Sequence, residues 1–313
     1  MKKQFIAILV ILLCGAIFFA RGCNGNRRFV DRGIEYIVWS KDSQALFYSK
    51  SQHKLYRYDV RRGDRRSYKM PDRLVEFDVS PDGRSVVFPM VRNNTYGMYV
   101  LKLDTQKTKR VSVIKNAVRE SSTGRPEKSL EFLKRITDIS WLPQNDVIIV
   151  FDVGKGVKEI DLLHFKNGRL DKLRGNVTYY DGASKDGKLL LYEDLDSRIH
   201  LYNLETKKDR RLDLGHHVTD PSSIRFLYLS SSQLLFTYDK PKQAARTLDL
   251  ATMQVKPINL PDVEGISCIS GDLARCLSGT SAHPSAIGGW TSNKVYVTKL
   301  PDDVVRTLCR LEH

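Results

Sequence analysis

The chain has 313 residues, of which 41% are hydrophobic, and its formal net charge is +15. That length could hold two domains, although an array of repeats of this length counts as one. The sequence contains no G-x-S-x-G, H-E-x-x-H or phosphate-loop motif, so it lacks the commonest signatures of serine hydrolases, zinc peptidases and NTPases. We expect no cofactor, no metal and no catalytic residues.

Residues 1–23 are predicted to be a signal sequence or a membrane anchor. Two lysines precede residues 5–20, a run of sixteen uncharged and mostly apolar residues, which is typical of a secretory signal. As a transmembrane helix the run would span about 24 Å, short of the ~30 Å hydrocarbon core. Three outcomes stay open: an uncleaved anchor, plain cleavage, or lipidation at Cys23, whose preceding residues loosely match a bacterial lipobox.

Residues 24–33 are polar and are predicted to be a short tether. The domain that follows would therefore lie close to a membrane. Because the apolar run opens the chain, we expect this domain to be exported, in the periplasm or envelope of a bacterium.

Residues 74–111 show the unit from which the rest of the chain is built. Residues 74–79 alternate apolar and polar side chains and lead into the turn SPDG at residues 80–83, where proline fixes one backbone angle and glycine tolerates positive φ. Three further short strands follow, separated by polar turns. One such four-stranded meander cannot bury its own apolar faces, so it should recur.

The unit occurs six times in the chain. The residues that end the first strand of each copy are Ser40, Ser80, Leu142, Ser184, Ser230 and Ser270. Their spacings are 40, 62, 42, 46 and 40 residues, and a period near 40 with four strands per unit is the signature of a β-propeller. We therefore predict an all-β, six-bladed propeller over residues 34–310, preceded by one N-terminal hydrophobic helix. The predicted four-stranded blades span residues 34–70, 74–112, 136–174, 177–214, 224–260 and 263–310.

Two long loops interrupt the repeat. Residues 114–134 account for the spacing of 62 and are either a solvated excursion or an arm for a partner. Residues 278–293, which include His283, are long enough to fold over the central tunnel. His216 and His217 lie just before blade five, where their position favours a turn over a metal site.

Three segments carry a family resemblance: VWSKDSQALFY (38–48), VSPDGRSVVF (79–88) and ASKDGKLLLY (183–192). Together with strands such as LYRYDV and IHLYNL, they resemble the TolB-type six-bladed propellers with WD40-like (PD40) repeats. The resemblance covers residues 34–310 and is strongest in blades one, two and four. It implies an extracytoplasmic, protein-binding scaffold, mostly without catalysis. TolB itself also carries an N-terminal α/β domain, which we do not expect here, so a role in the Tol system does not follow.

One face of the propeller is predicted to be basic. The turns between strands one and two and between strands three and four share this face, and they concentrate the positive charge in blades one to four. The candidate residues for an anionic partner are Arg61, Arg62, Arg65, Arg66, Lys107, Lys109, Arg110, Lys207, Lys208, Arg210 and Arg211. Blade three adds Lys166, Arg169, Lys172 and Arg174 to this crescent.

Such a field attracts anionic partners. The alternatives are anionic lipid headgroups, an envelope glycopolymer, an acidic protein, or turns that are merely solvated. We do not expect nucleic acid, because few aromatic residues are interleaved with the basic turns. The sequence does not indicate an oligomeric state.

The chain has five cysteines. Cys268 and Cys276 flank a turn on the first two strands of blade six and are a candidate disulfide in an oxidising compartment. Cys309 could instead form a disulfide with either of these cysteines. No spacing indicates a zinc site or a redox C-x-x-C motif.

These observations favour a non-enzymatic, membrane-associated binding module whose partner is a protein or an anionic envelope polymer. The main alternative is a propeller enzyme, for example one like a polysaccharide lyase, with a site at the mouth of the central tunnel. A purely structural envelope component is a second alternative.

Overall fold

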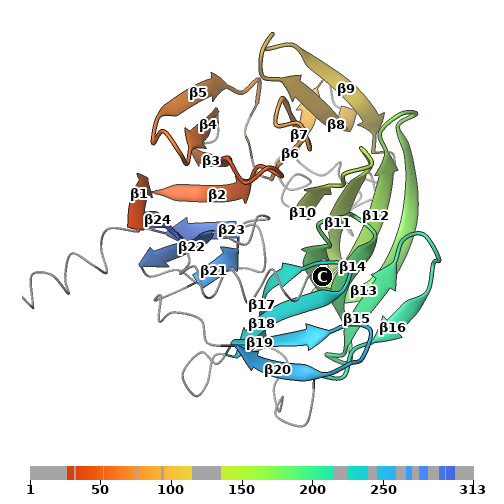
Figure 1. Cartoon of the computed structure of the whole chain (residues 1–313). Coiled ribbons are helices and arrows are strands. Elements are labelled where there is room, and N and C mark those ends of the chain that lie inside the picture. Colours follow the sequence, from red (N-terminus) through yellow and green to blue (C-terminus); the bar gives the residue numbers. More distant parts are fainter. Residues whose placement is uncertain are drawn as a thin grey trace, which may run out of the picture.

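The computed structural model describes residues 27–31, 33–51, 53–72, 74, 76–92, 95–114, 135–214, 224–238, 245–258, 266–269, 275–280, 289–292 and 294–299. All secondary-structure elements assigned in these ranges are β-strands. They form antiparallel sheets that are arranged like blades around a central axis (Figure 1). The predicted all-β, six-bladed propeller is confirmed for this part of the chain. The predicted N-terminal helix lies outside the described residues.

Blades one and two each run in chain order from the inner to the outer strand. Blade one contains β2 (Ile34–Trp39), β3 (Ala45–Ser51), β4 (Lys54–Asp59) and β5 (Arg65–Lys69). Blade two contains β6 (Asp78–Val79), β7 (Ser85–Arg92), β8 (Thr95–Lys102) and β9 (Thr108–Val113). The strand β23 (Gly289–Ser292) pairs with the inner edge of β2, so part of the predicted loop 278–293 is a strand.

Blades three and four share one continuous strand and form a single seven-stranded sheet. Blade three contains β10 (Ile136–Trp141), β11 (Val147–Gly154) and β12 (Val157–His164). Its outer strand is the first part of β13 (Arg169–Ala183), whose second part is the inner strand of blade four. Blade four is completed by β14 (Leu189–Asp194), β15 (Ile199–Asn203) and β16 (Asp209–Arg211).

Blades five and six close the ring. Blade five contains β17 (Ile224–Leu229), β18 (Gln233–Tyr238), β19 (Ala245–Asp249) and β20 (Val255–Ile258). Blade six contains β21 (Ile266–Ile269), β22 (Arg275–Thr280) and β24 (Lys294–Lys299), and its outer strand is β1 (Arg27–Asp31) from the other end of the chain.

The position of β1 corrects the prediction for residues 24–33. We expected these residues to be a tether outside the propeller, but residues 27–31 pair with β24 in antiparallel register, from Arg27 opposite Thr298 to Asp31 opposite Val295. A strand from one end of the chain thus completes the blade built by the other end. The ring is closed by this pairing and by the packing of Val30 against blade one.

Apolar side chains fill the spaces between neighbouring blades. Phe47 of blade one packs with Phe77 and Phe88 of blade two in one buried cluster. Trp141 lies in the next cluster, between blades two and three, where its ring centroid is 5.0 Å from that of Phe165. Alternation along the strands places apolar side chains on both faces of each sheet, which explains why the unit had to recur.

The turns after the inner strands of blades one, two and four repeat the same hydrogen bonds. The Ser40 hydroxyl accepts the amide N–H of Ala45 at 2.9 Å and donates to Asp42 at 2.6 Å. Ser80 and Ser184 make the equivalent bonds in blades two and four. The fourth residue of each turn has positive φ, and it is Gly83 in blade two and Gly187 in blade four.

Candidate functional site

Two sets of turns share one face of the ring, which we call the turn face. It carries the turn between the first and second strands and the turn between the third and fourth strands of each blade. The two turns contact each other within a blade: the N–H of Val60 donates to the Gln44 carbonyl at 3.0 Å, and the N–H of Leu204 donates to the Lys188 carbonyl at 2.8 Å. The face is therefore a rigid rim of paired turns.

The turns between strands three and four are fixed by side-chain caps. The Asp59 carboxylate accepts the N–H groups of Arg61 and Arg62 at 3.0 and 2.9 Å. These backbone hydrogen bonds, that from Arg62 first, hold the pKa of Asp59 below its ordinary value. Asn203 caps the corresponding turn of blade four in the same way. Because the caps bind the backbone, the basic side chains of these turns project from a fixed frame.

All eleven candidate residues of the basic crescent are exposed on these turns or on the adjoining outer strands. Two of them bind neighbouring blades. Arg65 forms an ion pair with Asp31 of β1, and the guanidinium of Arg210 donates to the Leu250 carbonyl of blade five at 2.7 Å. These two arginines hold the ring together, so we remove them from the set that is available to a partner.

Eight of the remaining residues have no ion-pair partner within the part of the chain that the structure describes. We call them the free cations of the turn face. They are Arg62, Arg66, Lys107, Lys109, Arg110, Lys207, Lys208 and Arg211. The crescent is interrupted at blade three, where Arg169 pairs with Asp171 at 2.6 Å and Lys172 pairs with Glu159 at 2.6 Å.

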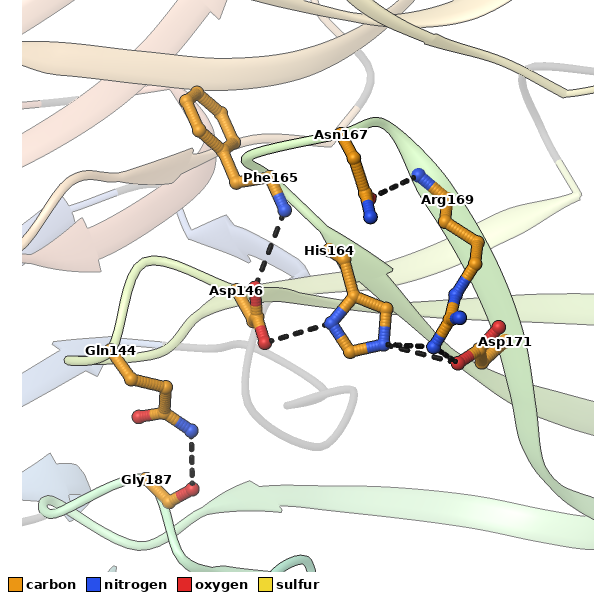
Figure 2. A network of polar contacts seen from close by, with 8 residues as sticks. All are labelled: Gln144, Asp146, His164, Phe165, Asn167, Arg169, Asp171 and Gly187. Carbon is orange, nitrogen blue, oxygen red and sulfur yellow. Dashed lines mark hydrogen bonds and ion pairs between the residues drawn. The ribbon is translucent and has the colours of Figure 1, made fainter.

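A histidine held between two carboxylates occupies the turn face of blade three (Figure 2). Nδ1 of His164 lies 3.1 Å from Asp146, and Nε2 lies 3.1 Å from Asp171. A neutral imidazole has only one N–H, so both contacts are hydrogen bonds only when the ring is protonated. Burial acts to raise the pKa of Asp171, but the hydrogen bonds from His164 and Arg169 hold it below its ordinary value.

The turn that contains Asp146 also joins blade three to blade four. The side-chain amide of Gln144, in the turn that contains Asp146, donates to the Gly187 carbonyl at 3.0 Å (Figure 2). A second histidine, His200 of blade four, is also flanked by two carboxylates, with Nε2 3.0 Å from Asp194 and Nδ1 3.2 Å from Asp209. Sequence reasoning missed both histidines, because their partners come from the strands or turns on either side.

Sequence reasoning also did not identify a set of polar side chains near the central axis. The position four residues before the end of the first strand is Tyr36, Glu76, Asp138 and Tyr180 in blades one to four. Tyr36, Asp138 and Tyr180 are buried. Burial raises the pKa of Asp138 well above its ordinary value, and the nearby charges of Glu76 and Asp78 add to this rise. Aligning the six repeats at this one position would have revealed the group.

The described residues contain no group of three or more His, Cys, Asp or Glu side chains placed to hold a metal ion. In the same ranges, no helix has the length and apolar character needed to cross a bilayer. Residues 5–20 and Cys23 lie outside these ranges, and so do His216, His217, His283 and Cys309. Of the predicted loop 114–134, only Ile114 is described. The predictions for these residues stay predictions.

Comparison with known proteins places the fold. The chain is similar to an oligogalacturonate lyase in complex with manganese (14% identity, TM-score 0.53, covering 86% of this chain and 77% of that one) and to the WD40 repeats of RRP9 (12% identity, TM-score 0.50, 89% and 98%). A crystal structure of TolB from Acinetobacter baumannii matches at 18% identity with a TM-score of 0.49, over 73% of this chain. The matches with TM-scores of 0.50 and above show a WD40-like β-propeller fold.

At these identities the likeness concerns the fold alone. The chain spans only 55% of the TolB chain that it matches. No family model and no curated protein matches the sequence. The function of this propeller therefore has to be argued from its own residues.

The candidate disulfide of the propeller lies on blade six. In the register of β21 and β22, Cys276 stands opposite Ile269, and Cys268 stands opposite Leu277. The two cysteines are thus offset by one residue along the hairpin. The disulfide stays a prediction.

Proposed function

We propose that the chain is a non-enzymatic, membrane-associated propeller of the bacterial envelope that binds a protein or an anionic envelope partner through its turn face. The observation that carries the proposal is the set of free cations on blades one, two and four. An unpaired surface cation costs little to keep in water, but eight of them on one side of a rigid ring create a field that attracts negative charge.

The capped turns support a binding role. Asp59 and Asn203 hold the backbone of their turns, so the neighbouring arginines and lysines do not have to order a loop when a partner binds. Fixed presentation lowers the entropic cost of association. The resemblance to TolB-type propellers supports an envelope location, and the apolar run at residues 5–20 supports association with a membrane.

The test compares two charge-matched variants. The full-length protein and an Arg62→Gln/Lys107→Gln/Lys207→Gln variant are used to capture partners from detergent-solubilised bacterial envelope. The control is Lys54→Gln/Lys69→Gln/Lys155→Gln, which removes the same charge from the opposite face. We expect capture by the wild type and the control, with elution at high salt, and at least a tenfold loss in the turn-face variant.

Two results would contradict the proposal. Equal capture by both variants would show that the turn face does not bind the partner. Absence of any partner whose capture depends on charge would instead favour the enzyme alternative.

That alternative rests on a separate observation, the polar group of Tyr36, Glu76, Asp138 and Tyr180, which lie on or just before four consecutive inner strands. Buried ionisable groups with raised pKa values are common at active sites. A screen of acidic envelope and plant polysaccharides for formation of unsaturated products would test it, with Asp138→Asn as the inactive variant. Binding at the turn face and activity at the axis give independent readouts.

A further inference from the structure

The chain enters the propeller on the turn face. In every blade the third strand runs toward the turn face and the fourth strand runs away from it. In blade six the fourth strand is β1, and its first residue, Arg27, stands opposite Thr298, near the end of β24. Its last residue, Asp31, stands opposite Val295, near the start of β24. The end of β1 that receives the preceding chain is therefore the end at the turn face.

The preceding apolar run is close in sequence. Six residues, 21–26, separate the run at 5–20 from β1, and six residues reach at most about 20 Å when fully extended. A five-residue strand such as β1 is itself about 17 Å long. A membrane that held the apolar run could meet the opposite face only if this linker were stretched along the whole height of the blade.

We infer that the turn face lies against the bilayer that holds residues 5–20, and that its free cations bind anionic lipid headgroups. This inference rests on the proposed membrane association and selects the lipid among the anionic partners considered above. The two observations are independent: one is the direction of β1, and the other is the placement of the free cations on the same face.

Charge and distance agree with this arrangement. Each lysine or arginine close to an anionic membrane surface strengthens binding roughly fivefold, and the effect fades over about 8 Å, the Debye length at physiological ionic strength. A linker of six residues keeps the turn face within reach of that layer. Lys54 and Lys69 stand opposite each other at the far end of blade one and would remain in water.

The experiment measures lysine acylation in the full-length protein. The protein is reconstituted into nanodiscs of phosphatidylcholine alone or of phosphatidylcholine with phosphatidylglycerol, labelled with an amine-reactive ester, and analysed by mass spectrometry at low and high salt. In the anionic discs at low salt, we expect labelling of Lys107, Lys207 and Lys208 to fall about fivefold or more. Labelling of Lys54, Lys69 and Lys155 should not change.

A variant separates lipid contact from burial by other causes. In Lys107→Gln/Lys207→Gln/Lys208→Gln, the exposed Lys166 on the turn face serves as the reporter. Its protection by anionic lipid should be lost in this variant and kept in the Lys54→Gln/Lys69→Gln/Lys155→Gln control.

The outcomes separate this inference from the proposed function. Equal labelling in both kinds of disc, or protection of Lys54 and Lys69 instead, would overturn the orientation while leaving charge-dependent capture of another partner intact. Failure of the chain to remain in any disc would overturn the membrane association itself, and this inference with it. Protection confined to anionic discs at low salt supports both.

Discussion

The Tyr48 hydroxyl donates a hydrogen bond of 2.8 Å to the carboxylate of Asp31, across the junction between the two ends of the ring. Tyr48 is fully buried in blade one, whereas Asp31 ends the strand that completes blade six. Lys50 pairs with the other carboxylate oxygen at 2.7 Å, and Arg65 binds the same group. One carboxylate therefore collects three donors from blade one and fixes the closing strand.

We expect the Asp31→Ala substitution to weaken closure of the ring. It leaves the Tyr48 hydroxyl buried without an acceptor, which costs about 1–3 kcal/mol, and it removes two partly shielded charge contacts. Urea unfolding should show a loss of about 2–4 kcal/mol, and limited proteolysis should cut first near residues 27–31. Glu205→Ala, which breaks only the exposed ion pair with Lys188, is the control and should change stability by less than about 0.5 kcal/mol. Equal effects would show that Asp31 does not fix β1.

Contacts between blades can be probed at two equivalent glycines. Gly83 and Gly187 occupy the same turn position, with φ of 68° and 71°. A Cβ added at Gly83 meets no atom within 4 Å, whereas one added at Gly187 would lie 2.6 Å from Pro143 Cδ and 2.6 Å from Gln144 Oε1 of blade three. Only the second substitution therefore disturbs the junction between blades three and four.

We expect Gly83→Ala to cost about 1 kcal/mol, which is the price of a left-handed backbone alone. Gly187→Ala should cost about 2–4 kcal/mol, because crowding against a proline ring adds to that strain. Thermal unfolding of the two variants measures the difference directly. Similar losses would mean that the turns of blades three and four do not pack as tightly as their hydrogen bond suggests.

The sequence predicted the propeller because its signal is local and repeated. Ser40, Ser80 and Ser184 make the same turn with the same hydrogen bonds, so each copy reinforces the period. Ring closure was not predictable in this way, since β1 is a single short strand whose partner lies at the far end of the described chain. Its residues RRFVD look polar enough for a tether, and only the pairing with β24 assigns them to blade six.

The basic face was predictable from the sequence, but which of its residues are free cations was not. Arg65 and Arg66 are neighbours with the same charge, yet Arg65 binds Asp31 whereas Arg66 has no ion-pair partner among the described residues. The difference depends on which residues of the next blade come close, and composition does not contain that information. The same holds for His164, whose two carboxylates come from the first turn and the outer strand of its blade.

The partly buried acid Asp181 should make stability depend on pH. Burial, together with the charge of Glu193, raises the pKa of Asp181 to about 7, compared with about 3.9 for an unfolded aspartate. Between these values the folded state binds more protons than the unfolded state, so stability falls as the pH rises from about 4 to about 7. Asp181→Asn mimics the neutral acid and should abolish this component.

Urea unfolding of wild type and Asp181→Asn at pH 5 and pH 8 tests this prediction. The stability of the asparagine variant relative to wild type should increase by up to about 2–3 kcal/mol over this range, following ~1.4 kcal/mol per pH unit up to the folded-state pKa. Asp59→Asn is the control, because backbone hydrogen bonds lower the pKa of Asp59 and confine its contribution to pH values below about 4. Its difference from wild type should stay constant between pH 5 and pH 8. A constant difference for Asp181→Asn as well would mean that Asp181 ionises in the folded protein as it does in water.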